Sequence, residues 1–215
     1  MVGAIIFDAF GTLARIVQPT NPYRELIREG RRQGVAVNPA SIHIAMTTRL
    51  SITEMASHLG VSLTPSKREE LESAVELELS SIEPYPDAIE AVSRLQNAGI
   101  QLGICSNLAA PYGPIVSSLF PKMDGYAYSY ELGVMKPESA IYQSICNQMG
   151  VEPGRFFSSE TGRVVMIGDS RRCDRDGPRT VGISGFHLDR TGRGQIQNLT
   201  QFAQIVLDQG MVEPT

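Results

Sequence analysis

The chain has 215 residues, of which 42% are hydrophobic and 20% are charged, and its formal net charge is −4. This composition is ordinary for a globular protein, and the length allows one core domain with a modest insertion. A slightly acidic chain has no basic footprint for nucleic acid, so we expect no nucleic-acid partner. No apolar run approaches the ~20 residues of a membrane span, so we expect no membrane partner either.

The N-terminus and the cysteines predict a cytoplasmic protein. The first residues run from Met1 directly into a motif, without the basic and apolar regions of a signal peptide. The cysteines, Cys105, Cys146 and Cys173, are odd in number and match no disulfide or metal-binding pattern. Reduced thiols are typical of the cytoplasm. No feature of the sequence indicates an oligomeric state.

The first predicted element is a short buried strand over residues 4–8, which is apolar and ends before Gly11. About 70 residues without a clear strand follow. Helices are expected there over residues 22–33, 40–59 and 65–82. Pro65 opens the last of them, and Ser66 with Glu69 fits a capping box. A proline-rich stretch at 84–86 marks the end of this helical region.

From residue 87 onward the pattern alternates between helix and strand. We predict helices over 87–98, 111–120, 138–149 and 199–208, and strands over 100–105, 126–130, 164–167 and 182–186. This alternation indicates an α/β fold with a parallel, doubly wound sheet. It resembles a Rossmann-like three-layer core. We assign residues 1–14 and 85–215 to that core, and residues 15–84 to a small α-helical cap domain inserted after the first strand.

Two of the predicted strands end in carboxylates. The first runs into Asp8-Ala9-Phe10-Gly11-Thr12-Leu13, and the strand over 164–167 runs into Gly168-Asp169-Ser170, with Asp174 shortly after. In an open α/β sheet, ligands bind at the carboxyl ends of the strands. Two carboxylates that converge there can hold a hard divalent cation, and one of them can also attack an electrophile.

Two further features fall between these motifs. Ser106-Asn107 ends the strand over 100–105, and Lys136-Pro137 precedes the helix that ends at Met149. Lys67, Lys122 and Lys136 are the only lysines in the chain, which makes Lys136 easy to single out.

In this order, the motifs resemble those of the haloacid dehalogenase superfamily of hydrolases, in its phosphatase-like branch with a small helical cap. The resemblance implies that Asp8 is the nucleophile, and that Ser106 and Lys136 are catalytic groups that also hold the transferring phosphoryl group. It further implies substrate contacts from the backbone around Thr12 and Asn107.

The same resemblance implies a magnesium site. Its ligands would be Asp8, the backbone carbonyl of Phe10, and Asp169, with Asp174 ligating the ion or holding its water molecules. Mg²⁺ takes oxygen ligands and usually keeps several waters, which suits such a set.

Phe10 departs from the phosphatase pattern. Phosphatases of the superfamily carry a second aspartate at this position, which protonates the leaving alcohol and then activates water. Phe10 cannot transfer a proton. General acid–base groups contribute roughly 10²–10⁴-fold, so we expect hydrolysis of phosphate esters to be slow.

The aromatic residue leaves two alternatives open. The first is a 2-haloacid dehalogenase, whose first motif is similar and which would need a cap arginine such as Arg24 or Arg49. The second is a weak or inactive member that binds a phosphorylated ligand or a protein partner. Asp169 favours the phosphatase branch, because a second carboxylate beside Asp8 needs a cation to offset the repulsion. We therefore expect a Mg²⁺-dependent hydrolase that acts on a small phosphorylated metabolite through an aspartyl-phosphate intermediate.

Overall fold

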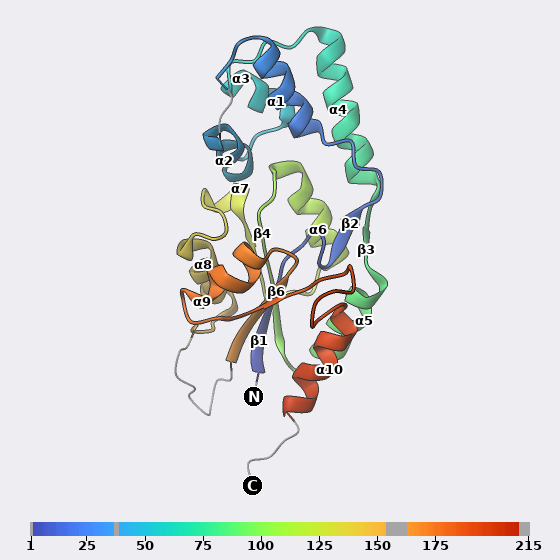
Figure 1. The fold of residues 1–215 in the computed structure, drawn as a ribbon, viewed down its shortest axis with the longest axis vertical. Coiled ribbons are helices and arrows are strands. Elements are labelled where there is room, and N and C mark those ends of the chain that lie inside the picture. Colours follow the sequence, from blue (N-terminus) through green and yellow to red (C-terminus); the bar gives the residue numbers. More distant parts are fainter. Residues whose placement is uncertain (1, 37–38, 154–162, 211–215) are drawn as a thin grey trace.

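Five parallel strands form the central sheet of the computed structural model, which describes residues 2–36, 39–153 and 163–210 (Figure 1). Their spatial order is β5-β4-β1-β6-β7. The strands are β1 Val2–Phe7, β4 Gln101–Ser106, β5 Gly125–Tyr128, β6 Arg163–Gly168 and β7 Ser184–His187. All neighbouring pairs run parallel. The α/β class and the parallel sheet predicted from the sequence are confirmed.

Helices cover both faces of the sheet, giving three layers (Figure 1). One face packs against α5 Pro86–Asn97, α6 Gly113–Leu119 and α10 Leu199–Gly210, and the other lies beneath α8 Ser139–Met149 and α9 Gly177–Arg179. The central strand β1 contributes side chains to the core on both faces of the sheet, because successive side chains of a strand point to opposite faces. Ile5 and Phe7 belong to one apolar cluster, and Ala4 and Ile6 belong to the other.

Between β1 and α5 the described residues form four helices, which we call the helical insertion. They are α1 Pro22–Arg32, α2 Pro39–Thr47, α3 Ile52–His58 and α4 Pro65–Ser80. These helices share an apolar cluster of their own, which includes Leu26, Met55 and Leu71. Figure 1 shows the insertion standing over the end of the sheet where β1 and β4 terminate.

The insertion is joined to the sheet by a short antiparallel ribbon. Its strands are β2 Ala14–Ile16 and β3 Ile82–Pro84, which the chain follows on the way into and out of the insertion. The sequence analysis did not predict this ribbon, because three residues are too few for a period-two pattern to be recognised. Our proposed boundaries at 14/15 and 84/85 fall within or next to its strands.

The helix predicted over 40–59 is in fact two helices. Ser51 caps the second one, accepting a hydrogen bond from Glu54 N while the Glu54 side chain accepts from Ser51 N. This capping box starts a new helix after α2 has ended. The box predicted at Ser66 is likewise displaced, because the N-cap of α4 is Thr64, whose hydroxyl accepts from Lys67 N at 3.2 Å.

Two other local differences lie near the site. The strand predicted over 126–130 ends at Tyr128, and the chain turns at once into the short helix α7 Ser129–Leu132. Short helical turns also occupy η1 Ala110–Tyr112 and η2 Arg171–Asp176, and the second is a π-helix, a form that periodicity does not reveal.

The three cysteines form no disulfide, as predicted. Over the described ranges, no helix has the length and apolar character needed to cross a membrane. The predicted domains also include residues 1, 37–38, 154–162 and 211–215, which lie outside the described residues.

Candidate active site

Asp8 follows directly after β1, in the middle of the sheet edge. Strand β1 lies between β4 and β6, so Ser106 at the end of β4 and Asp169 after β6 reach the same edge. The sheet extends in opposite directions from β1 toward β4 and toward β6. In doubly wound sheets such a reversal of strand order leaves the crevice in which ligands bind.

The carboxylate of Asp8 is held by two donors. Ser106 Oγ donates to Asp8 Oδ1 at 2.8 Å, and Lys136 Nζ donates to the same oxygen at 2.7 Å. Lys136 Nζ also donates to Asp174 Oδ1 at 2.7 Å. All four of these side chains are buried. The site thus combines one ammonium group with two carboxylates in a region from which water is largely excluded.

Lys136 is positioned by the side chain of Asn107. Asn107 Nδ2 donates to Lys136 O at 3.0 Å, and Lys136 N donates to Asn107 Oδ1 at 2.7 Å. The amide therefore binds both backbone polar groups of the lysine. This arrangement fixes the loop before α8 against the end of β4.

Three carboxylates form a possible metal centre. Asp8, Asp169 and Asp174 each offer an oxygen, and these atoms all lie within 4.8 Å of one another. An all-oxygen set of this kind suits a hard divalent cation. Its compactness depends on two glycines. A Cβ on Gly168 would lie 2.3 Å from Asp174 Oδ2, and a Cβ on Gly11 would lie 2.1 Å from Asp169 Oδ2.

The charges of the site are not balanced by protein groups alone. Burial and the nearby Asp8 carboxylate raise the pKa of Asp169 above its ordinary value, and the same two causes raise the pKa of Asp174. Burial by itself would lower the pKa of Lys136, but the carboxylates of Asp8 and Asp174 outweigh it and hold that pKa well above normal. The single ammonium group of Lys136 therefore does not compensate all of the carboxylates around it. A bound cation would correct this imbalance.

Asp174 has both carboxylate oxygens engaged. In addition to the Lys136 contact, Asp174 Oδ2 accepts from Ser170 N at 2.8 Å, at the start of the π-helix η2. Asp169, in contrast, has an exposed side chain. The two residues therefore differ in position, with Asp174 beside the lysine and Asp169 on the open side of Asp8.

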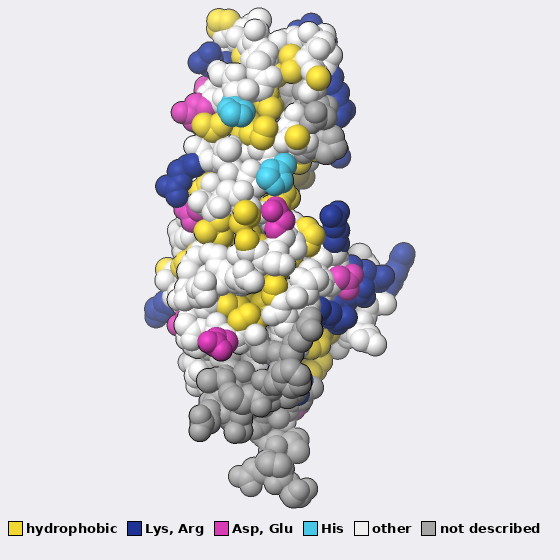
Figure 2. Space-filling view, turned by 90° about the vertical axis from the view of Figure 1, so that its left-hand side faces the viewer, with side chains coloured by type: hydrophobic (Ala, Val, Ile, Leu, Met, Phe, Trp, Pro, Cys, Tyr) yellow, Lys and Arg dark blue, Asp and Glu magenta, His cyan; other side chains and the backbone are white. Residues whose placement is uncertain are grey.

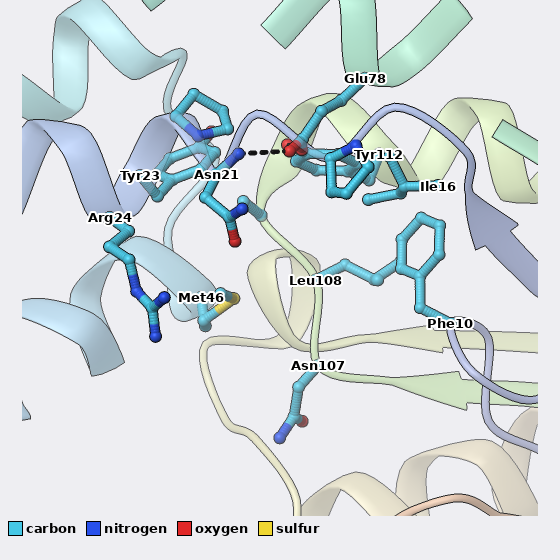
Figure 3. Close-up of a pocket in the computed structure, with 13 residues that line it drawn as sticks. Phe10, Ile16, Asn21, Tyr23, Arg24, Met46, Glu78, Asn107, Leu108 and Tyr112 are labelled. Atoms are coloured by element: carbon cyan, nitrogen blue, oxygen red, sulfur yellow. Dashed lines mark hydrogen bonds between the residues drawn. The ribbon is translucent and has the colours of Figure 1, made fainter. Parts of the chain in front are cut away.

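Phe10 lies on the side of Asp8 that faces the helical insertion. Its ring packs edge-on against Tyr112, with ring centroids 5.8 Å apart. It lines a cavity of about 320 Å³ between the sheet edge and the insertion, which we call the apolar hollow. Figure 3 shows Phe10, Leu108 and Met46 around this space, with Tyr112 and Glu78 at the side nearer α4.

A second hollow lies on the other side of Asn107 and has several ionisable side chains in its lining. Its lining includes His43 from α2, the catalytic candidate Lys136, Glu138 and Arg172. His43 Nε2 is 3.5 Å from Glu138 Oε1. Figure 2 faces this side of the molecule, and it shows histidine, acidic and basic side chains near the level where the insertion meets the sheet.

The remaining predicted residues have distinct surroundings. Thr12 is fully buried, and its hydroxyl has no hydrogen-bond partner among the described residues. Of the two arginines considered for a dehalogenase, Arg49 is paired with Glu131 at 2.9 Å and lies over the ring of Tyr130. Arg24 lines the apolar hollow.

The sequence analysis missed an arginine that shapes the loop after the nucleophile. Arg190 donates to Gly11 O at 3.1 Å and to Thr12 O at 2.7 Å, while its other terminal nitrogen contacts Asp87 at 3.0 Å. The guanidinium also lies 3.8 Å from the centroid of the Tyr85 ring. Nearly 180 residues separate Arg190 from Gly11. No local pattern could have revealed the contact.

It also missed the buried acid at the junction with the insertion. Glu78 of α4 accepts hydrogen bonds from Thr20 N at 2.7 Å and Asn21 N at 2.6 Å, and its other oxygen accepts from Tyr112 OH at 2.5 Å. Burial and the hydrogen bond to Glu78 raise the pKa of Tyr112. The acids of this helix were interpreted as a solvated face. The helical spacing of Glu78 from Leu71 and Val75 was the one signal in the sequence that set it apart from them.

The family model for haloacid dehalogenase-like hydrolases matches residues 2–182. The chain belongs to this family. The match includes the strand ends that carry Asp8, Ser106 and Asp169, together with Lys136 and the whole helical insertion. The protein is accordingly a hydrolase with the superfamily's α/β fold.

Both branches of the family occur among the similar proteins. Phosphatase MT3486 of Mycobacterium tuberculosis is 25% identical over 95% of this chain and 97% of its own length. A phosphatase of the family from Thermococcus onnurineus superposes with a TM-score of 0.63 at 24% identity, covering 96% of this chain and 98% of that one. A 2-haloacid dehalogenase from Pseudomonas syringae pv. Tomato superposes with a TM-score of 0.64 at 15% identity, covering 97% and 100%. These two structures share the fold.

Proposed function

We propose that this hydrolase is a Mg²⁺-dependent phosphatase that acts on a small phosphorylated metabolite. The observation that carries the proposal is the group of three carboxylate oxygens within 4.8 Å of one another beside a single buried lysine. A site built to expel a halide from a neutral carbon has no need for this concentration of acids. A phosphoryl group with a bound cation would fit it, because opposite charges then alternate through the site.

In the proposed reaction Asp8 is the nucleophile. One of its oxygens is held by Ser106 and Lys136, which leaves the other free to attack phosphorus. Ser106 and Lys136 stand where they would also contact the phosphoryl oxygens, with backbone N–H groups near Thr12 and Asn107 as further donors. The product of the attack is an aspartyl phosphate, which water then hydrolyses.

The metal would be held by Asp8, Asp169 and the Phe10 carbonyl. When bound, Mg²⁺ supplies charge neutralisation between the nucleophile and the phosphoryl oxygens. Asp174 would hold Lys136 in place and orient metal-bound water. We regard the helical insertion as the cap that closes the site, because it forms one wall of the apolar hollow beside Phe10.

The test is hydrolysis of p-nitrophenyl phosphate with and without Mg²⁺, with Asp8→Asn as the background. Turnover that needs both Mg²⁺ and Asp8 is the expected result. Equal rates in the wild type and Asp8→Asn, for this ester and for a panel of metabolite phosphates, would overturn the proposal. That result would favour the alternative of an inactive family member, which binds a phosphorylated ligand or a protein partner without turning it over.

A second candidate, 2-haloacid dehalogenation, is favoured by one observation. Arg24 lines the apolar hollow, and no hydrogen bond or ion pair involving it is found among the described residues. A free guanidinium beside an apolar space could receive a carboxylate. Release of chloride from 2-chloropropionate, independent of Mg²⁺ and abolished by Asp8→Asn, would establish this activity in place of the phosphatase.

A further inference from the structure

The apolar hollow is the space into which a substrate's leaving group would extend. Phe10 follows the nucleophile by two positions, and Leu108 follows Ser106 by two, so the hollow is lined by the segments that continue from Asp8 and Ser106. Its volume of about 320 Å³ is at the lower end of the range for small-ligand pockets. Carbon atoms of Phe10, Ile16, Met46, Leu108 and Tyr112 contribute to its wall. Such a wall favours a compact apolar body.

The described lining of the hollow offers no proton to a departing oxygen. Glu78 is the one carboxylate in it, and both of its oxygens are occupied, because they accept hydrogen bonds from Thr20 N, Asn21 N and Tyr112 OH. The Tyr112 hydroxyl directs its proton to Glu78. The Tyr23 hydroxyl is enclosed by protein and is closed off from the hollow. Arg24 does not release a proton in proteins.

The other polar groups around Asp8 are also engaged. In the proposed function Asp169 holds the metal, so its carboxylate is bound to a cation. The ammonium group of Lys136 is bound to Asp8 and Asp174 at 2.7 Å each. Asp174 is enclosed between that ammonium group and Ser170 N. An oxygen that leaves phosphorus into the hollow therefore leaves as an anion.

Resting on the proposed phosphatase function, we propose that the substrates are monophosphates of compact apolar groups that depart as stabilised anions. The class comprises aryl phosphates, which release a phenolate, and acyl phosphates, which release a carboxylate. Both combine a carbon skeleton that fits the apolar hollow with an oxygen that needs no proton to depart. Phosphates of simple sugars and alcohols lack both properties.

The bonds and electrons of the reaction balance without an acid. An oxygen of Asp8 forms a bond to phosphorus while the bond from phosphorus to the leaving oxygen breaks, and its electron pair stays on the phenolate or carboxylate. Water then forms a bond to the same phosphorus, and the bond to Asp8 breaks. Asp8 is regenerated as a carboxylate, and the proton lost by water ends on inorganic phosphate or in solvent.

The first experiment varies the leaving group at nearly constant size. It measures kcat/KM in Mg²⁺ for phenyl phosphates carrying para-nitro, para-chloro, hydrogen or para-methyl groups. For the wild type we expect kcat/KM to fall by at least about 10²-fold from the nitro to the methyl compound, since no group protonates the poorer leaving oxygen. Equal kcat/KM values for the four compounds would overturn the proposal. Such a result would mean that a group such as His43 in the second hollow protonates the leaving oxygen.

Variants at Phe10 sharpen this result. Phe10→Asp places a carboxyl group beside the leaving oxygen, so we expect it to raise kcat/KM for the phenyl and para-methyl compounds and flatten the series. Phe10→Asn is the matched control, with the same size and no acid, and should keep the steep dependence. If either variant fails to fold, the kcat/KM values of the wild type for the four compounds are sufficient to test the proposal.

The second experiment tests the apolar body. Benzoyl phosphate and acetyl phosphate release carboxylates of similar basicity, so they differ mainly in the ring. We expect KM for benzoyl phosphate to be lower by at least about tenfold, a ratio typical of burying an apolar side chain of this size. Met46→Gln should remove most of this preference. Met123→Gln, a matched change in a different hollow, should retain it.

The two proposals fail in different ways. If no aryl phosphate, acyl phosphate or metabolite phosphate of the panel is hydrolysed above the Asp8→Asn background in Mg²⁺, the phosphatase function itself is overturned. If only the metabolite phosphates are hydrolysed, the function stands and the substrate class proposed here is wrong. The same holds if aryl and acyl phosphates are hydrolysed with a flat leaving-group series or with equal KM for benzoyl and acetyl phosphate.

Discussion

The two sides of Asp8 are built in contrasting ways. One side is charged and consists of the buried Ser106, Lys136 and Asp174 and the exposed Asp169, held by strand ends and the loops beside them. The other side is apolar and consists of Phe10 and the wall of the hollow, part of which is supplied by the helical insertion. In the proposed function, chemistry and selectivity therefore belong to different parts of the fold. Changes on one side should alter turnover, and changes on the other should alter which substrates are accepted.

The largest expected effect comes from the centre of this contrast. Asp8→Asn retains the shape of the side chain but removes the nucleophile, so we expect Mg²⁺-dependent phosphatase activity to fall by roughly 10⁴-fold or more. Initial rates with p-nitrophenyl phosphate measure it. Asp208→Asn, an exposed carboxylate on α10, is the control and should retain full activity. Comparable activity in the two variants would exclude Asp8 as the nucleophile.

On the charged side, Lys136→Met should destabilise the fold. The substitution leaves the buried carboxylates of Asp8 and Asp174 without their cation, and breaking a buried ion pair typically costs about 3–5 kcal/mol. Urea unfolding without metal measures the loss. Lys122→Met changes an exposed lysine in the same way and should shift the midpoint little. If both variants unfold at the same urea concentration, Lys136 does not hold the site together.

Asp169→Asn should separate metal binding from folding. The raised pKa of Asp169 means that its ionised form is less favourable in the folded state than in the unfolded one. Without Mg²⁺, the variant should therefore be at least as stable as the wild type. With Mg²⁺, only the wild type should gain thermal stability, and activity should fall by about 10²–10³-fold in the variant. Equal stabilisation of both proteins by Mg²⁺ would contradict the ligand assignment.

The smallest expected effect concerns the apolar side. Glu78→Gln replaces one carboxylate oxygen with a donor that faces other donors, so we expect a loss of about 1–3 kcal/mol in the free energy of unfolding. Glu76→Gln, on the same helix, is the matched control and should be nearly neutral. Unfolding by urea, followed by circular dichroism, compares them. A neutral Glu78→Gln would show that the junction of insertion and sheet does not depend on this carboxylate.

Much of the charged side could be predicted because it follows from topology. Asp8, Ser106 and Asp169 each come directly after a buried strand, and parallel strands bring their carboxyl ends to one edge. Only Lys136 needed the family resemblance, since nothing local says that a lysine before a helix will turn back toward β1. The sheet was likewise readable from short apolar runs separated by helices.

The apolar side could not be predicted, because its members meet only through tertiary contacts. Tyr112 and Glu78 are 34 positions apart, on different parts of the fold. Helical spacing from Leu71 and Val75 does place Glu78 on the buried face of α4, but it does not reveal which groups the carboxylate meets there. The break between α2 and α3 was, in contrast, available in the sequence, since Ser51 and Glu54 have the capping-box spacing. A long apolar periodicity outweighed that signal and merged two helices into one.

The amide of Asn107 has a mechanical consequence. By binding both the N–H and the C=O of Lys136, it acts as one more rung of a β-ladder, made by a side chain after the strand itself has ended. Lysine has a long side chain with many rotamers, and ordering it is costly in entropy. The hydrogen bonds to Asn107 fix the backbone of Lys136 against the sheet, so its backbone no longer adds to the conformational freedom of the side chain. The stiffness of β4 is thereby extended to an ammonium group that belongs to no strand, which keeps the charge in register with Asp8.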